Sequence, residues 1–99
     1  MCGAPEQTLS PAGVDVGTES LVQGTVTRGG TPVGGAYVRL LDGTGEFTAE
    51  VVTSAAGAFR FFAAPGAWTL RALAPGAIGE STVTAARGVV AHAEIALPV

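Results

Sequence analysis

The sequence has only one cysteine and one histidine among its 99 residues. A single cysteine cannot form an internal disulfide, so the fold is expected to rest on packing alone in a reducing compartment. A single imidazole also supplies too few nitrogen ligands for a histidine-based zinc site. Neither a disulfide framework nor a metal centre of this kind is therefore expected, and no cofactor is predicted.

Lysine is absent, and the five basic residues, all arginine, face eight acidic ones. The net charge of −3 argues against nucleic acid and anionic membrane surfaces as partners. No apolar run approaches the roughly 20 residues of a membrane-spanning helix, and the N-terminus shows no basic n-region followed by an apolar h-region. We therefore expect a cytoplasmic protein with no nucleic-acid or membrane partner.

Charged residues make up only 13% of the chain, whereas 47% of the residues are hydrophobic. A chain of 99 residues forms one domain with a thin core, so part of its surface must be apolar or weakly polar. Such a surface favours association, and both a protein partner and an oligomer are open expectations.

Seven short segments alternate apolar and polar residues, and Gly or Pro turns bound them. No segment has helical periodicity. We predict an all-β fold, a seven-stranded antiparallel Greek-key β-sandwich over residues 20–99, preceded by a flexible N-terminal arm at residues 1–19. The expected strands are Leu21 to Arg28, Ala36 to Asp42, Thr48 to Ser54, Ala58 to Ala63, Trp68 to Leu73, Ser81 to Ala86 and Val89 to Leu97.

The alternation also assigns a buried face to each strand, because side chains two residues apart point to the same side. Three aromatic rings, Phe59, Phe61 and Trp68, are expected to dominate this core. The full set of residues with the inward phase is Val22, Val26, Ala36, Val38, Leu40, Phe59, Phe61, Trp68, Leu70, Val89, Ile95 and Leu97.

Four short motifs resemble the carboxypeptidase regulatory-like domain, a transthyretin-related sandwich. They are Gly24-x-Val26, Pro32-Val33-x-Gly35-Ala36-x-Val38, Gly57-x-Phe59 and Pro65-Gly66-x-Trp68-x-Leu70. The resemblance covers roughly Leu21 to Leu73 and consists of turn and core positions. It implies a transthyretin (prealbumin)-like topology and a structural role, and it brings no catalytic residue with it.

Three further stretches, together with the Met1-Cys2 start, are similar to a family of small free-standing bacterial proteins. These stretches run from Arg39 to Asp42, from Glu46 to Val52 and from Arg60 to Gly66. Members of that family are of unknown function and are often encoded beside thiosulfate sulfurtransferases. The resemblance thus implies a link to sulfur metabolism, with a thiosulfate sulfurtransferase as the expected partner.

Cys2 and His92 are the side chains with the greatest chemical potential, and each has two interpretations. Cys2 is either an inert thiol or an acceptor of sulfur through a persulfide or mixed disulfide, although no basic neighbour in the sequence lowers its pKa. His92 shares the outward phase of its strand with Glu94, as a base and its orienter would. Without a nucleophile nearby, a surface role is favoured, and no catalytic or metal-binding residue is predicted.

Arginine and aromatic residues share the outward phase of three predicted strands. If these strands are neighbours in one sheet, they form a cationic and aromatic interaction face of Tyr37, Arg39, Arg60, Phe62 and Arg71. In the competing interpretation, Glu50 and Glu94 neutralise an ordinary solvated surface. The loop from Asp42 to Glu46 has too few oxygen donors for a calcium site and is expected to be a turn.

The favoured interpretation is a non-enzymatic protein-interaction or accessory module associated with a sulfurtransferase. Two alternatives stay open, a sulfur-handling protein that uses Cys2 and a sandwich that binds a small ligand or carbohydrate.

Overall fold

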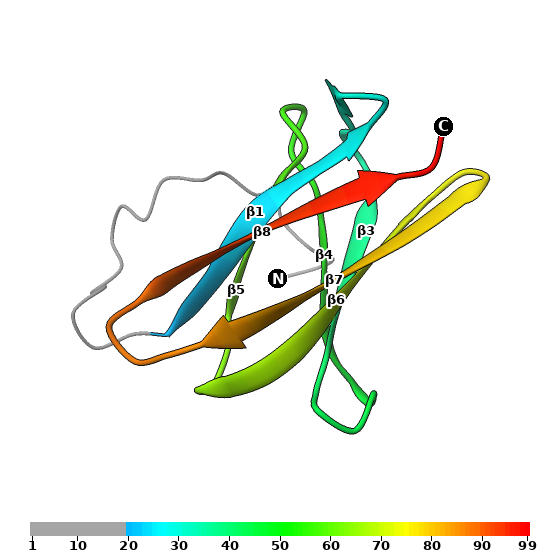
Figure 1. Cartoon of the computed structure of the whole chain (residues 1–99). Coiled ribbons are helices and arrows are strands. Elements are labelled where there is room, and N and C mark those ends of the chain that lie inside the picture. The colour runs from blue at the N-terminus through cyan, green and yellow to red at the C-terminus, as the bar shows by residue number, and fades with distance from the viewer. Residues whose placement is uncertain (1–19) are drawn as a thin grey trace, which may run out of the picture.

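The alternating segments form eight strands in the computed structural model, which describes residues 20–99 (Figure 1). No helix occurs in this part of the chain. Residues 20–99 therefore contain no helix that is long and apolar enough to cross a membrane. The strands are β1 (Leu21–Arg28), β2 (Thr31–Pro32), β3 (Tyr37–Leu41), β4 (Phe47–Val52), β5 (Ala58–Phe62), β6 (Gly66–Ala74), β7 (Ala77–Ala85) and β8 (Val90–Leu97).

All seven predicted strands are present, β1 with the predicted ends and the other six with shifted ends, and the predicted all-β class is confirmed. The predicted number is wrong, because Thr31–Pro32 adds an eighth strand, β2. Two residues are too few to show alternation, and this segment lies between the Gly29-Gly30 and Gly34-Gly35 pairs, which read as turns. The predicted arm at residues 1–19 lies outside the described residues.

The strands form two four-stranded sheets. In the first, called the β1 sheet, β5 and β2 pair with one edge of β1 and β8 pairs with the other. In the second, called the β3 sheet, the order is β4-β3-β6-β7, and every pairing is antiparallel.

The pairing of β1 with β8 is parallel, so the prediction of a wholly antiparallel fold is wrong at this point. The two strands run side by side in the same direction in Figure 1, from Leu21 beside Val90 to Arg28 beside Leu97. Hairpins force neighbouring strands to be antiparallel, but β1 and β8 are the first and last strands and no hairpin joins them.

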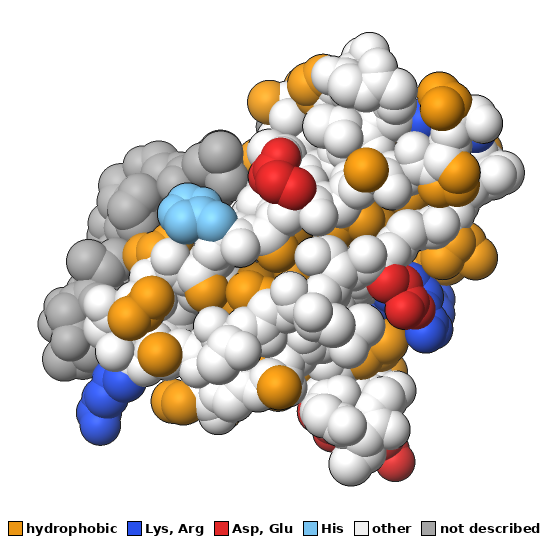
Figure 2. Space-filling model, in the orientation of Figure 1, with side chains coloured by type: hydrophobic (Ala, Val, Ile, Leu, Met, Phe, Trp, Pro, Cys, Tyr) orange, Lys and Arg blue, Asp and Glu red, His pale blue; other side chains and the backbone are white. Residues whose placement is uncertain are grey.

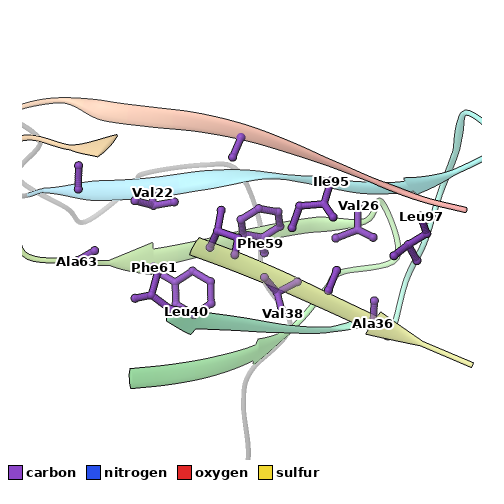
Figure 3. Packing of buried hydrophobic residues seen from close by; sticks show 14 of the residues in the cluster. Val22, Val26, Ala36, Val38, Leu40, Phe59, Phe61, Ala63, Ile95 and Leu97 are labelled. Carbon is purple, nitrogen blue, oxygen red and sulfur yellow. The ribbon is translucent and has the colours of Figure 1, made fainter. Parts of the chain in front are cut away.

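Side chains from both sheets meet in one hydrophobic core (Figure 3). Phe59, which is fully buried, lies near Phe61 with 6.2 Å between ring centroids. The predicted core residues that the structure confirms as buried are Val22, Val26, Ala36, Val38, Leu40, Phe59, Phe61, Leu70, Ile95 and Leu97.

Two predicted core residues, Trp68 and Val89, are not buried. Trp68 is half-buried and packs against the core from its margin, where its indole N–H donates to the carbonyl oxygen of Ala64 at 2.8 Å. A partly buried indole N–H usually has such an acceptor. The carbonyl of Ala64 lies at the exposed margin of the core, and the bond to it holds the ring there. Val89 is 46% exposed because it belongs to the turn before β8, where strand alternation does not apply.

Candidate functional site

The two sheets divide the predicted interaction face. Tyr37 and Arg39 lie on β3 and Arg71 lies on the neighbouring β6, but Arg60 and Phe62 lie on β5, in the other sheet. A single face of all five residues is therefore wrong. Strand phase is a local property, whereas membership of a sheet depends on pairing between distant segments.

The arginines of the β3 sheet stand in the middle of a charged row that crosses all four strands. Strand register places Glu50, Arg39, Arg71 and Glu80 side by side in this order. Nε of Arg39 lies 2.8 Å from Oε2 of Glu50, and Nε of Arg71 lies 2.5 Å from Oε2 of Glu80. Two positive and two negative charges cancel, so this face is locally neutral rather than cationic.

Both ion pairs are exposed and contribute little to stability, roughly 0.2 to 1 kcal/mol each. Each arginine uses Nε, and no hydrogen bond joins the terminal nitrogens of Arg39 or Arg71 to another described residue. Terminal guanidinium nitrogens of this kind can donate to a carboxylate or carbonyl of a bound molecule. The ion pairs thus hold the arginines in place while leaving donors for a ligand.

An apolar row crosses the same sheet face next to the charged one. Its members, in strand order, are Val52, Tyr37, Leu73 and Ile78. Tyr37 is 52% exposed and Ile78 is 59% exposed. Neighbouring strands are about 4.8 Å apart, so the four side chains form a continuous apolar strip.

The strip continues into a shallow hollow at the turn between β6 and β7. Leu73 and Ile78 belong to both, and the rest of the lining is almost wholly apolar: Ala74, Gly76, Ala77 and Pro98. Arg28 holds this corner together, since its guanidinium donates to the carbonyl oxygens of Pro98 at 3.0 Å and of Pro75 at 3.1 Å. In Figure 2, hydrophobic side chains likewise reach the surface at several places among polar and charged groups.

Glu80, Leu73, Ile78 and Val52 were not predicted as members of a site. The sequence predicts a strand that begins at Ser81, whereas β7 begins at Ala77 and includes both Ile78 and Glu80. Alternation does extend back through Gly79 to Ala77, and this signal would have placed both residues on the outward face.

The outer face of the β1 sheet carries a different set of polar residues. Register aligns Arg60, Gln23 and His92 across β5, β1 and β8. Glu94 does not orient His92. Its carboxylate accepts the hydroxyl hydrogen of Thr25, with oxygen distances of 2.6 and 2.7 Å, and forms no hydrogen bond with the imidazole. The predicted neutralisation of the arginine face by Glu94 is also wrong, since Glu80 takes that place.

Gln23 and Leu21 are buried although they share the outward phase of β1. β1 is the central strand of its sheet, with Phe62 and Val90 on either side of Leu21. The Oε1 atom of Gln23 is buried, and no residue between 20 and 99 forms a hydrogen bond with it.

The loop after β3 is a turn, as predicted. Oδ1 of Asp42 accepts hydrogen bonds from the hydroxyl of Thr44 at 2.6 Å, from its backbone N–H at 2.8 Å and from the N–H of Glu46 at 3.0 Å. These bonds, the hydroxyl bond foremost, lower the pKa of Asp42 from its ordinary value. The carboxylate is thus committed to the turn.

Cys2 lies outside the described residues, so its role as a thiol acceptor stays a prediction. Within residues 20–99, no three His, Cys, Asp or Glu side chains gather closely enough to hold a metal ion.

Comparison with known proteins identifies relatives along nearly the whole chain. The uncharacterized proteins Rv0814c and Rv3118 of Mycobacterium tuberculosis (strain ATCC 25618 / H37Rv) are each 58% identical to it over 85 residues, which covers 84% of this chain and 85% of each relative. An uncharacterized protein of Mycolicibacterium smegmatis is 62% identical over 74 residues, 74% of this chain and 82% of that protein. The family described as protein of unknown function (DUF1416) matches residues 2–97, and the chain belongs to this family.

Proposed function

We propose that this chain is a non-enzymatic module that binds a protein partner through the outer face of the β3 sheet. In this proposal the module is of the carboxypeptidase regulatory-like type with a transthyretin-like Greek-key topology. The observation that carries the proposal is the apolar row of Val52, Tyr37, Leu73 and Ile78, which lies directly beside two anchored arginines.

Single exposed apolar side chains are common on protein surfaces and need no explanation. Here, two exposed and two half-buried apolar side chains are adjacent across four strands and continue into an apolar hollow. Tyrosine and arginine are also enriched at protein interfaces, where the ring supplies area and the guanidinium supplies directed donors. A partner with an apolar patch bordered by carboxylates or carbonyls fits this arrangement.

The partner that we propose is a cytoplasmic thiosulfate sulfurtransferase. Support comes from the resemblance of the stretches Arg39 to Asp42, Glu46 to Val52 and Arg60 to Gly66 to proteins often encoded beside such enzymes. The first two of these stretches contribute Arg39, Glu50 and Val52 to the face described above. The module would act as an accessory to the enzyme, without contributing a reactive group of its own.

The test measures binding of the full chain to the purified thiosulfate sulfurtransferase of the same organism by isothermal titration calorimetry. Ile78→Glu is expected to weaken binding at least tenfold, because Ile78 lies where the apolar strip meets the hollow, and a carboxylate that a bound partner covers there loses its hydration. Phe62→Glu is the matched control, since Phe62 is also 59% exposed but lies on the other sheet. Its affinity should equal that of the wild-type chain.

Absence of binding by the wild-type chain would overturn the choice of partner. Equal weakening by Ile78→Glu and Phe62→Glu, or no weakening by Ile78→Glu, would overturn the choice of face. Circular dichroism of each variant checks that the sheets remain folded.

A further inference from the structure

We propose that a second copy of this chain pairs with the edge of β4, so that two β3 sheets join into one antiparallel sheet across a two-fold axis. The inference concerns the edge of the sheet, whereas the proposed function concerns its outer face, and neither depends on the other.

The two edges of the β3 sheet differ in what lies against them. β7 forms one edge and approaches β8 of the other sheet so closely that a Cβ on Gly79 would lie 3.1 Å from Ala96, Ile95 and Leu97. β4 forms the other edge, and among the described strands it pairs only with β3. The second edge is thus the one at which a further strand can be added.

The backbone of β4 has donors and acceptors on this edge. Thr53, directly after the strand, faces β3: its N–H donates to the carbonyl of Ala36 at 2.9 Å, and its own carbonyl accepts from Gly35 at 3.1 Å. Successive residues of an antiparallel strand alternate in the direction of these groups. The N–H and C=O groups of Glu50 and Val52 therefore point away from β3.

The register of the proposed pairing follows from the regular part of this edge. A bulge between Leu40 and Leu41 puts Thr48 out of step, so the regular part of the edge is short. A two-fold axis at Val51 then places Glu50 of each copy opposite Val52 of the other, and both outward-pointing residues of each chain exchange N–H···O bonds.

Charge supports the same register. A shift of the axis to Glu50 would bring this carboxylate directly opposite its own copy, which is destabilising, and would also require the displaced Thr48. With the axis at Val51, Glu50 lies beside a valine and keeps its ion pair with Arg39 at 2.8 Å. β4 contains no proline, lysine or glycine that would protect its edge.

The inner face of the edge favours a second copy over an unrelated strand. Val51 is half-buried and packs against the hydrophobic core. Across the axis it would meet the same residue of the second copy, so each valine would cover the exposed part of the other and extend both cores. A strand from another protein would have to place an apolar residue opposite Val51 and, at the same time, no negative charge opposite Glu50.

Sedimentation velocity over a range of concentrations tests the pairing with the full chain and two proline variants. The wild-type chain is expected at about twice the 9.8 kDa of one chain. Val52→Pro removes an N–H that points away from β3, so it should yield a folded monomer. Phe62→Pro is the matched control and should stay dimeric, because Phe62 also ends an edge strand and directs its N–H away from its neighbour, as the bond of the next residue, Ala63, to Ser20 shows.

Disulfide trapping provides a second readout that does not depend on proline. In a Cys2→Ser background, Val51→Cys should cross-link to its own copy on oxidation, because directly opposed residues at a non-hydrogen-bonded position have Cβ atoms at a distance that a disulfide can span. Ala49→Cys, half-buried on the same face of β4, should not cross-link, since it lies opposite Thr53.

The proposal is overturned by a chain that sediments as a monomer at every concentration, by a dimer that persists in Val52→Pro, or by equal cross-linking of the two cysteine variants. Loss of the dimer in Phe62→Pro as well would show that the effect of proline is not specific to the β4 edge, and this result would also overturn the proposal.

Discussion

The aromatic residues of this domain differ in burial and therefore in how much each stabilises the fold. Phe59 is fully buried, whereas Trp68 is half-buried at the margin of the core. We expect Phe59→Ala to lower the free energy of unfolding by about 3 to 5 kcal/mol, a large fraction of the stability of a small domain. Trp68→Ala should cost less, because solvent already reaches part of the indole and less apolar area is lost.

Urea unfolding followed by circular dichroism measures both variants, and Trp68→Phe isolates the bond to Ala64. That variant keeps most of the ring area but loses the indole N–H, so its cost should be about 1 kcal/mol. A Trp68→Ala variant as unstable as Phe59→Ala would contradict this ranking and would place Trp68 among the residues essential for folding.

Residue by residue, alternation predicted burial well where a strand is regular. Val38, Leu40, Leu70 and Ile95 are all buried as their phase requires. The rule fails where a residue leaves the strand, as Val89 does. It also fails for Leu21, which has the outward phase of β1 but is buried. Phase depends only on neighbours in sequence, whereas burial depends on what covers the face.

Among the elements, the turn between β3 and β4 contains a carboxyl group, that of Asp42, whose pKa is lowered in the folded state. Hydrogen bonds to the ionised form, above all from the Thr44 hydroxyl, hold the pKa of Asp42 below 3.8. A carboxyl with a lowered folded-state pKa stabilises the fold above its unfolded pKa of about 3.9. This contribution is lost as the pH falls through the folded-state pKa.

NMR titration of the Asp42 carboxyl carbon checks this prediction. The pKa should lie below 3.8 in the wild-type chain and should rise toward that value in Thr44→Val, which removes the strongest of the hydrogen bonds. Thr84→Val, on the exposed face of β7, is the control and should leave the titration unchanged. An Asp42 pKa at or above 3.8 would mean that the turn does not hold the carboxylate in solution.

The elements themselves were largely predictable, but their neighbours were not. Gly and Pro turns located seven of the eight strands, because turn chemistry is local. The interaction face failed for the opposite reason: Arg39 and Arg71 are adjacent across β3 and β6, whereas Arg60 belongs to β5 in the other sheet. No local pattern distinguishes β5 from β6, since both alternate in the same way and differ only in which strand they pair with.

In the whole molecule, the first and last strands complete the fold together. β8 pairs with β1 along its full length, and Ile95 and Leu97 place the end of the chain in the core. β1 connects β5 and β2 on one edge to β8 on the other, so its sheet depends on contacts between residues about 70 positions apart, such as Leu21 with Val90. Such long-range pairing is expected to slow folding, because the loop must close before the contact is gained.

Gly24 lies at the centre of this pairing, and we expect Gly24→Ala to abolish cooperative folding. A Cβ at this position would overlap the backbone carbonyl of Ala93 on β8 and would also approach the ring of Phe59 at 3.0 Å. The backbone cannot rotate away as a flexible side chain can, so β1 and β8 must separate, which removes ladder bonds and opens the core.

The control is Gly43→Ala, where the new Cβ would meet nothing closer than 4.0 Å and φ is not positive. Thermal unfolding should show a sharp transition for the control and none for Gly24→Ala. A Gly24→Ala chain that melts like the wild-type chain would mean that β8 does not lie this close to β1 in solution.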